Sequence, residues 1–485
     1  MDESTNEALR RDEVRDRAVG GAAVLGARGA VTFAIGIVAN LALARLLVPR
    51  DFGVVALGSV LLIVGTYLMD GGLGAALIRR TEPPERAELE AVEGLQLAAA
   101  TALAAIAAGA ALLFGRDGAV IALMLASLPI TTARLPAAIV LERQLLYRPV
   151  AFVDLVEALS YYAWALAAVA LGFGVWGLAS AVVARAILGV LTMARVGPVG
   201  FVRPRWSWPT VRPMIAFGAK LQATAVVAIG RDQGLNVGVA ALAGIPALGV
   251  WSLAYRILQV PTLIVTTATR VSFPAMARIL EAGEDPRPPI ERAVTTVAVV
   301  IGVVGVGLVG LAPALPALLG DGWADVPEAL LWSAAGLVLS APVIVGTIGY
   351  LYATDNAGTV VWGVVWQALV WFAVTLPLLP SLGAPAVGIG SVPAGVAIAA
   401  IVGRRAAAMS GAAVVRSLAR PLALSAAGGA AGWALASHGS ETLPWGLVGA
   451  LVAEVVLLGG LWLVGRSLLA DTYAIVARAV RRSVA

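Results

Sequence analysis

Charged side chains inside long apolar runs are the residues of this sequence that could do chemistry. The cations Arg28 and Lys220 each follow a Gly-Ala pair, in Gly26–Arg28 and Gly218–Lys220, about two turns into an expected helix. Arginine binds phosphate oxygens in a bidentate manner and lysine acts as a point charge, so two such cations facing one cavity would suit a diphosphate. The alternative is that both side chains snorkel to the membrane interface, about 10 Å away along the helix.

The other cations inside apolar runs are candidates for the same site. A charge at mid-membrane costs several kcal/mol unless it is paired or hydrated, which makes each one a functional candidate. The set comprises Arg134, Arg185, Arg231 and Arg256. For Arg134 and Arg185 the alternative is an ion pair with Asp154 or Glu157.

Carboxylates in the same apolar runs are candidates for binding a coupling proton or cation. They are Asp70, Asp154, Glu157 and Asp232. Asp70 lies in the glycine-rich segment Met69–Leu77, where a structural hydrogen bond to exposed backbone is an equal alternative. Arg231 and Asp232 are adjacent, so on a helix they point about 100° apart and each is expected to need its own partner or water. Glu93 lies near the end of its expected helix, where its side chain could reach the interface.

The segments that carry these charges are long and apolar. The chain has 485 residues, of which 60% are hydrophobic and 13% are charged, whereas a soluble domain has about 25% charged residues. Several apolar runs exceed the roughly 20 residues that cross about 30 Å of hydrocarbon. The composition therefore predicts an all-α polytopic membrane protein.

We expect about fourteen transmembrane helices and two cytoplasmic termini. The arginines of the connections gather on one side of the expected membrane, whereas the other side holds only Arg45, Arg50 and Arg116, and this asymmetry marks the cytoplasmic face of the inner (plasma) membrane. The expected spans are 20–43, 52–78, 92–114, 118–140, 150–171, 174–194, 214–242, 248–272, 293–312, 328–352, 358–379, 385–403, 421–437 and 445–465.

An internal repeat indicates two lobes. Gly26–Arg28 is followed by Leu47–Ser59, and Gly218–Lys220 is followed by the similar turn Gly244–Arg256; chance similarity between Gly/Ala-rich helices is the alternative. Both halves begin on the cytoplasmic side, so we expect parallel repeats with a cavity between them. The expected organisation is a surface helix at 1–19, an N-lobe at 20–195, a cytoplasmic linker at 196–213, a C-lobe at 214–403, two further helices at 404–466 and a cytoplasmic tail at 467–485.

The sequence also argues against several kinds of site. It has no cysteine and a single histidine, His438, which excludes disulfides, cysteine nucleophiles and an imidazole-built zinc site. We expect no catalytic residue, no metal and no cofactor, and we find no P-loop that would bind a nucleotide. The segment Phe201–Pro209 combines tryptophan with arginine, which suits an anchor against anionic lipid better than a nucleic-acid site.

Five segments carry a resemblance to a known family. Leu43–Leu57 and Asp70–Arg80 resemble the opening helices of bacterial polysaccharide exporters and O-antigen flippases, in the multidrug/oligosaccharidyl-lipid/polysaccharide exporter superfamily. Glu142–Leu159 and Gly172–Val183 resemble the fourth to sixth helices of that family. Phe217–Pro261 resembles the start of its second lobe. The resemblance covers residues 15–280, and the remainder of the chain is similar only in hydropathy.

The resemblance implies a bundle of twelve core helices plus two, whose central cavity alternates between the two faces of the membrane. The implied substrate is an undecaprenyl-diphosphate-linked oligosaccharide, and the cationic cavity of the family matches Arg28 and Lys220 by position without settling the other arginines. Energy would come from an ion gradient or from substrate flux, with no cofactor. The expected partners are this lipid-linked oligosaccharide and membrane lipids, with polysaccharide polymerase and assembly proteins as candidates, for a monomeric protein.

Three alternatives stay open. A cation-coupled multidrug exporter of the same superfamily would have a mainly apolar and acidic cavity. A membrane glycosyltransferase or polysaccharide polymerase would need a large outer loop or a pair of acids at the interface, whereas the longest outer connection, near 312–328, carries only Asp321, Asp325 and Glu328. A structural scaffold or a lipid scramblase without sugar specificity is the third.

Overall fold

The computed structural model describes residues 28–29, 31–80, 82–439, 442–466, 469–470 and 472–473, and most of these residues are helical. The side chains of residues 219–228 also lie outside this description. No strand occurs among the described residues. The all-α prediction is therefore confirmed.

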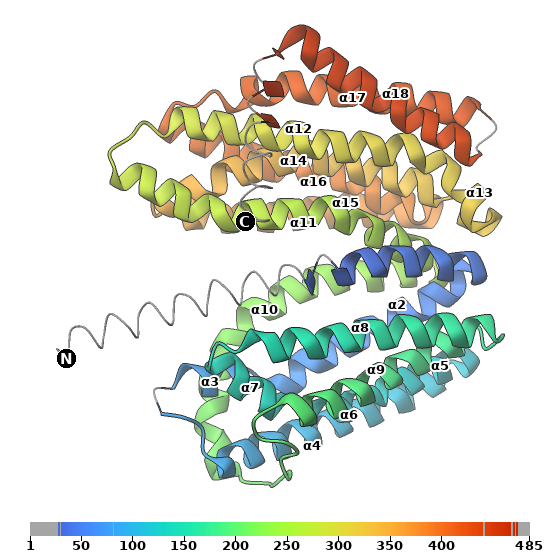
Figure 1. The fold of residues 1–485 in the computed structure, drawn as a ribbon, viewed down its shortest axis with the longest axis vertical. Coiled ribbons are helices and arrows are strands. Elements are labelled where there is room, and N and C mark those ends of the chain that lie inside the picture. The colour runs from blue at the N-terminus through green and yellow to red at the C-terminus, as the bar shows by residue number, and fades with distance from the viewer. Residues whose placement is uncertain are drawn as a thin grey trace. The chain divides into compact units, whose positions relative to one another are not determined.

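The chain divides into two compact units, residues 1–237 and 238–485, with the division inside one long helix, α10. The first unit holds a short apolar helix, Val31–Leu46, followed by α2 Pro49–Asp70, α3 Leu73–Arg79, α4 Arg86–Leu112, α5 Gly115–Leu125, α6 Ser127–Thr132, α7 Leu135–Arg143, α8 Tyr147–Ala170, α9 Val175–Val196 and most of α10 Trp208–Leu242. The second unit holds α11 Ile245–Glu281, α12 Arg287–Leu311, α13 Leu315–Leu319, α14 Val326–Ala353, α15 Ala357–Leu382, α16 Pro385–Ser410, α17 Val414–His438 and α18 Leu443–Val464, with two 3₁₀ turns at Ala312–Ala314 and Asp321–Trp323 (Figure 1).

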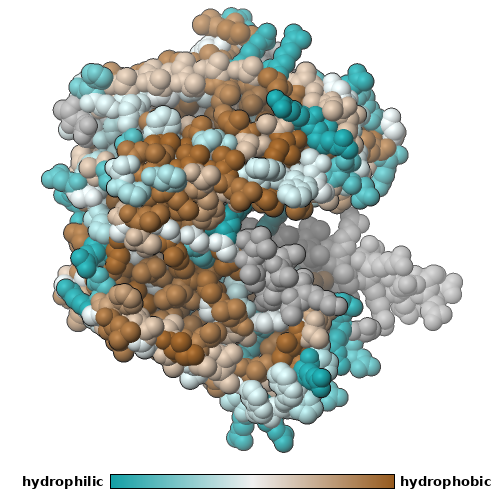
Figure 2. Space-filling model, turned by 180° about the vertical axis from the view of Figure 1, so that it is seen from behind, coloured by the Kyte–Doolittle hydropathy of each residue, from teal (hydrophilic) through white to brown (hydrophobic). Residues whose placement is uncertain are grey.

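The helices have the length and hydropathy of membrane spans. Ten of the described helices are long and apolar enough to cross a bilayer, or eleven if one bent pair counts as a single span. Each range predicted from hydropathy coincides with a helix or a broken helix where the structure describes it, but the count of fourteen remains a prediction. On the face shown in Figure 2, apolar residues cover much of the middle of each unit and hydrophilic residues gather toward the helix ends. This distribution fits a protein whose flanks face lipid.

Two of the predicted spans are broken in the first unit. Gly71 and Gly72 have φ values of 53° and 72°, a left-handed conformation that glycine adopts without steric cost, and they separate α2 from α3. Gly72 packs directly on the backbone of Gly218 in α10, so a side chain there would collide with that helix. The second break bends the pair Gly115–Thr132 and Leu135–Arg143 by 50°. The hydropathy of the sequence predicts one span for each of these broken helices, because the breaks contain no cluster of charged residues.

Glycines bring three helices of the second unit into backbone contact. Gly449 of α18 faces the backbone of Gly432 in α17 and of Gly310 in α12, and Gly428 of α17 faces Ala453 of α18. Small residues at such crossings allow close helix packing in membranes. Residues 310, 432 and 449 thus form a glycine seam that joins α12, α17 and α18.

Candidate functional site

Asp154 joins two of the predicted cations in the first unit. Its Oδ2 accepts a hydrogen bond from Nη1 of Arg28, and its Oδ1 lies 3.7 Å from Nη1 of Arg134. The side chains of Arg28 and Asp154 are about one-third exposed, at 31% and 28%. The ligand-binding role expected of Arg28 stays a prediction. The structure adds that Arg28 forms an ion pair with Asp154 of α8.

Glu157 joins two cations in the same way and is more deeply buried. Its Oε1 lies 2.9 Å from Nη1 of Arg134 and its Oε2 accepts a hydrogen bond of 3.3 Å from Nε of Arg185. The Glu157 side chain is 4% exposed, whereas that of Arg185 is 53% exposed. The five residues Arg28, Arg134, Asp154, Glu157 and Arg185 form one continuous chain of ion pairs, which we call the charged network.

Local structure explains how the charged network is assembled. Asp154 and Glu157 are three residues apart on α8, so they lie on the same face of that helix. Arg134 lies in the break between α6 and α7, where Ala133 and Arg134 separate the two helices. Arg185 comes from α9, and Gly189, one turn further along, leaves the space that Glu157 occupies.

The charged network contains more guanidinium groups than carboxylates and more unpartnered donors than acceptors. Three guanidinium groups share two carboxylates, and Glu142 of α7 is a third acid that interacts electrostatically with Asp154 and Arg134. The Nε atoms of Arg28 and Arg134 are buried and have no hydrogen-bond partner among the described residues, and the same holds for Oε1 of Glu157. A buried donor without an acceptor is costly, so the two Nε atoms are suited to a ligand that carries oxygen acceptors.

Asp70 belongs to a second polar group on α2 and α4. Its Oδ2 accepts from the backbone N–H of Gly72 at 3.1 Å, and its Oδ1 accepts from Nε2 of Gln96 at 3.3 Å. Asp70 therefore makes the structural hydrogen bond to backbone that was the alternative to ion binding. Gln96 is fully buried and is a polar residue that sequence reasoning missed, although its position inside an apolar run was a signal.

The interpretation of Glu93 as an interfacial side chain is wrong. Glu93 is 3% exposed, and its Oε1 accepts a hydrogen bond of 2.9 Å from the Thr132 hydroxyl. The reason is that α4 begins at Arg86, six residues before the predicted start, which moves Glu93 about two turns into the helix. Its other carboxylate oxygen has no hydrogen-bond partner among the described residues.

The remaining predicted site residues lie outside the charged network. Arg231 and Asp232 form an ion pair with each other at 2.7 Å, because the long arginine side chain folds back to its neighbour, so the expectation of separate partners is wrong. Arg256 lies on α11, in the second unit. Lys220 lies on α10, and its side chain is outside the described part of the chain.

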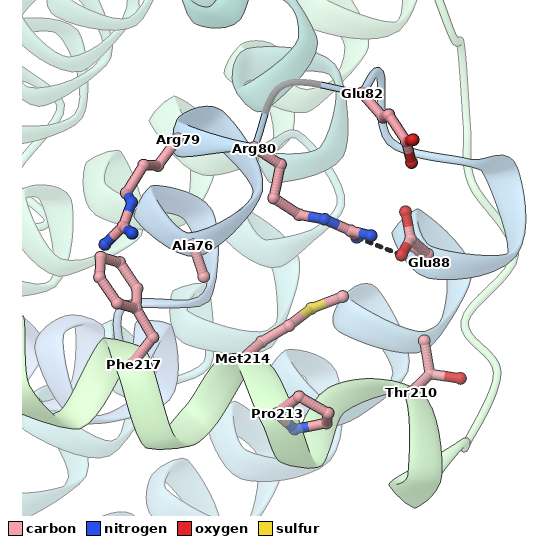
Figure 3. Close-up of a pocket in the computed structure, with 9 residues that line it drawn as sticks. All are labelled: Ala76, Arg79, Arg80, Glu82, Glu88, Thr210, Pro213, Met214 and Phe217. Atoms are coloured by element: carbon pink, nitrogen blue, oxygen red, sulfur yellow. Dashed lines mark hydrogen bonds and ion pairs between the residues drawn. The ribbon is translucent and has the colours of Figure 1, made fainter.

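A pocket of about 790 Å³ lies near the ends of α3, α4 and α10 (Figure 3). Arg79 points over the ring of Phe217, with its guanidinium carbon 4.6 Å from the ring centroid. Arg80 forms an ion pair with Glu88, and this hydrogen bond raises the pKa of Arg80 above its usual value. With Glu82 also in the lining, the pocket holds two cations and two carboxylates and therefore carries balanced charge, although only Arg80 pairs with one of the acids.

No group of three or more His, Asp or Glu side chains among the described residues could hold a metal ion. The arrangement that remains is the charged network, whose guanidinium groups can bind phosphate or sugar oxygens without a covalent step. Its carboxylates hold the arginines in position when no ligand is bound.

Comparison with solved structures identifies the fold. The chain is similar to a structure described as "Lipid II flippase MurJ, inward closed conformation", with a TM-score of 0.71 and 11% identity over 92% of this chain and 99% of that one. It is also similar to an inward-facing "multidrug resistance MATE family transporter of the MOP superfamily", with a TM-score of 0.54 and 17% identity over 77% of this chain and 95% of that one. At these identities the likeness shows the fold alone. No curated protein matches the sequence.

A family-level match comes from the sequence itself. The profile of the family described as "Polysaccharide biosynthesis protein" matches residues 42–328, which is more than half of the chain. This range includes α2 to α12 and four residues of the charged network, Arg134, Asp154, Glu157 and Arg185. The resemblance drawn from the opening helices and the start of the second lobe is confirmed, and the chain belongs to the polysaccharide biosynthesis protein family.

Proposed function

We propose that this protein is a flippase that moves an undecaprenyl-diphosphate-linked oligosaccharide across the inner membrane by alternating access, for the synthesis of a surface polysaccharide. The observation that carries the proposal is the charged network, in which three arginines share two carboxylates and two buried Nε donors have no acceptor among the described residues. Membership of the polysaccharide biosynthesis family and a fold shared with a lipid II flippase support it.

In this proposal the diphosphate and the carboxylates compete for the same guanidinium groups. Phosphate oxygens approaching Arg28 and Arg134 would take the place of Asp154, because an arginine fork binds phosphate as well as it binds carboxylate. A carboxylate that loses its guanidinium partner is left free to bind a coupling ion. Asp154 and Glu157 would thereby couple substrate binding to the binding of that ion.

The other predicted site residues have supporting roles in this proposal. Lys220 would add a point charge for the diphosphate, with Arg185, Arg231 and Arg256 as further phosphate or sugar contacts. Asp70 and Asp232 would be further candidates for the coupling ion. Both termini would lie in the cytoplasm, in accordance with the arginine asymmetry of the connections.

A leaflet assay tests the proposal directly. The purified protein is reconstituted into liposomes with a fluorescent undecaprenyl-diphosphate oligosaccharide, and glycosidase access to the sugar is followed from outside. We expect protein-dependent movement that is lost in the Arg28→Ala/Lys220→Ala double variant. Arg116→Ala, which changes a predicted outer loop, is the matched control and should retain movement.

The same preparation tests the second candidate, a cation-coupled multidrug exporter, which the shared fold with a multidrug transporter favours. That function would appear as efflux of an organic cation driven by an ion gradient, with no movement of the lipid-linked sugar. Sugar movement that persists in the double variant would contradict the role of the two cations while leaving the flippase assignment in place.

A further inference from the structure

A second cationic pocket lies in the other unit, between the first turns of α12 and α17. Its volume is about 450 Å³, compared with about 30 Å³ for one water molecule in the liquid. Arg292 lines it from α12, and Arg416 and Arg420 line it from α17. The hydroxyl-bearing side chains Thr296 and Ser417 also face it. We call this the α12–α17 pocket.

The three arginines of this pocket have no carboxylate partner among the described residues. Among the described residues that line the pocket, the one acid is Glu291, whose Oε1 accepts a hydrogen bond of 2.6 Å from the backbone N–H of Ala413. Glu291 is therefore engaged with the chain that leads into α17.

Three exposed arginines line this pocket from two helices. Arg416 and Arg420 are four residues apart on one helix, a spacing at which equal charges repel each other. Arg292 adds a third positive charge from the facing helix. An anion bound among them would remove the repulsion and could accept charge-assisted hydrogen bonds from both helices.

The surroundings of the pocket favour an amphiphile over a free anion. Beyond Thr296, α12 continues as an uninterrupted apolar run whose span has a mean hydropathy of 2.5. Val415, beside Arg416, is apolar and 80% exposed. Positive charge at the start of an apolar span is the arrangement that attracts acidic lipid headgroups at the cytoplasmic leaflet.

We propose that the α12–α17 pocket binds the phosphate headgroup of an anionic membrane phospholipid, which ties α17 to α12. The pocket near Arg80 in the first unit is a useful contrast, because its lining holds as many acids as cations and Arg80 already pairs with Glu88. The proposal does not depend on what the protein transports, since it concerns a lipid of the surrounding membrane. A free phosphate ion shares the same chemistry, and the experiment must separate the two sources.

Native mass spectrometry of the full chain in neutral detergent tests this proposal. The protein is titrated with phosphatidylglycerol, with phosphatidylcholine and with inorganic phosphate, and the dissociation constant of the first bound molecule is measured. We expect phosphatidylglycerol to bind more tightly than the other two. The Arg416→Gln/Arg420→Gln variant should bind it about tenfold more weakly or worse, because each arginine supplies a charged hydrogen bond.

Matched variants make the result specific. Arg278→Gln removes an exposed arginine of the same unit that does not line the pocket and should leave the dissociation constant unchanged. Arg292→Gln tests the facing helix and serves if the double variant does not fold. Unchanged binding of phosphatidylglycerol in the Arg292 and Arg416/Arg420 variants would overturn the proposal. Binding of inorganic phosphate as tight as that of phosphatidylglycerol would overturn it too, in favour of a free-anion site.

Discussion

The carboxylate of Glu157 occupies the space beside Gly189 that any larger residue at that position would need. Through this fit α8 and α9 approach each other at the point where Glu157 meets Arg134 and Arg185. Glycine at 189 is thus part of what holds the charged network together, although it carries no charge itself.

Gly189→Ala should therefore destabilise the protein. The added methyl group collides with a side chain that is held by two arginines, and overpacking of this kind costs about 1–3 kcal/mol. The unfolding midpoint in detergent reports the effect. Gly109→Ala is the control, since Gly109 lies in α4 with no neighbour near its missing Cβ and should gain slightly in stability. Equal midpoints for Gly189→Ala and the natural protein would show that α8 and α9 separate freely.

The two acids of the charged network should differ in their contribution to stability. Glu157→Gln removes the nearer carboxylate of Arg134 in a mostly buried position and leaves it only Asp154 at 3.7 Å, so we expect a loss of about 2–3 kcal/mol, reduced by the exposure of Arg185. Asp154→Asn removes a more exposed carboxylate and should cost about 1 kcal/mol or less. Chemical denaturation of both variants measures the difference. A larger loss of unfolding free energy for Asp154→Asn than for Glu157→Gln would contradict the greater contribution expected of the more buried Glu157.

The turn between α2 and α3 provides a matched pair of glycine substitutions. Gly71 and Gly72 both have positive φ, so alanine is strained by about 1 kcal/mol at either position. Only Gly72 also packs on the backbone of Gly218. We expect Gly72→Ala to lower the thermal unfolding midpoint by clearly more than Gly71→Ala. If the two variants unfold at the same temperature, the close approach to α10 contributes nothing.

Orientation in the membrane can be measured directly because the chain contains no cysteine. Glu82→Cys and Leu113→Cys place one thiol at each end of α4, both at exposed positions. With the termini in the cytoplasm, a membrane-impermeant maleimide should label Leu113→Cys in intact cells. It should label Glu82→Cys only after the membrane is opened. The reverse pattern would invert the predicted topology.

Hydropathy was sufficient to predict the class of fold and the approximate range of each helix. It could not predict the breaks after Asp70 and Thr132, because both lie inside runs that stay apolar. The early start of α4 was also missed, since its first turns are charged, and this is why Glu93 was interpreted wrongly. Hydropathy measures which residues tolerate lipid, whereas a helix end depends on local backbone geometry.

The residues of the candidate site were predictable from the sequence, but not all of the ion pairs between them were. Charges inside apolar runs identified all five residues of the charged network, and pairing of Arg134 and Arg185 with the acids of α8 was one of two expectations. The contact between Arg28 and Asp154 was not predictable from the sequence, because these residues are far apart along the chain. The ion pair between Arg231 and Asp232 was not predicted, because the Cβ directions of adjacent helical residues diverge. The arginine side chain is long enough to fold back to its neighbour all the same.

The glycine seam of the second unit has a mechanical consequence. At residue 449 the backbone of α18 approaches those of α12 and α17 at once, with no side chain between them that could change rotamer. Sliding any one of these helices along another would push Cα atoms into carbonyl groups. The three helices therefore resist sliding past one another at the seam, and any bending has to be absorbed at positions outside it.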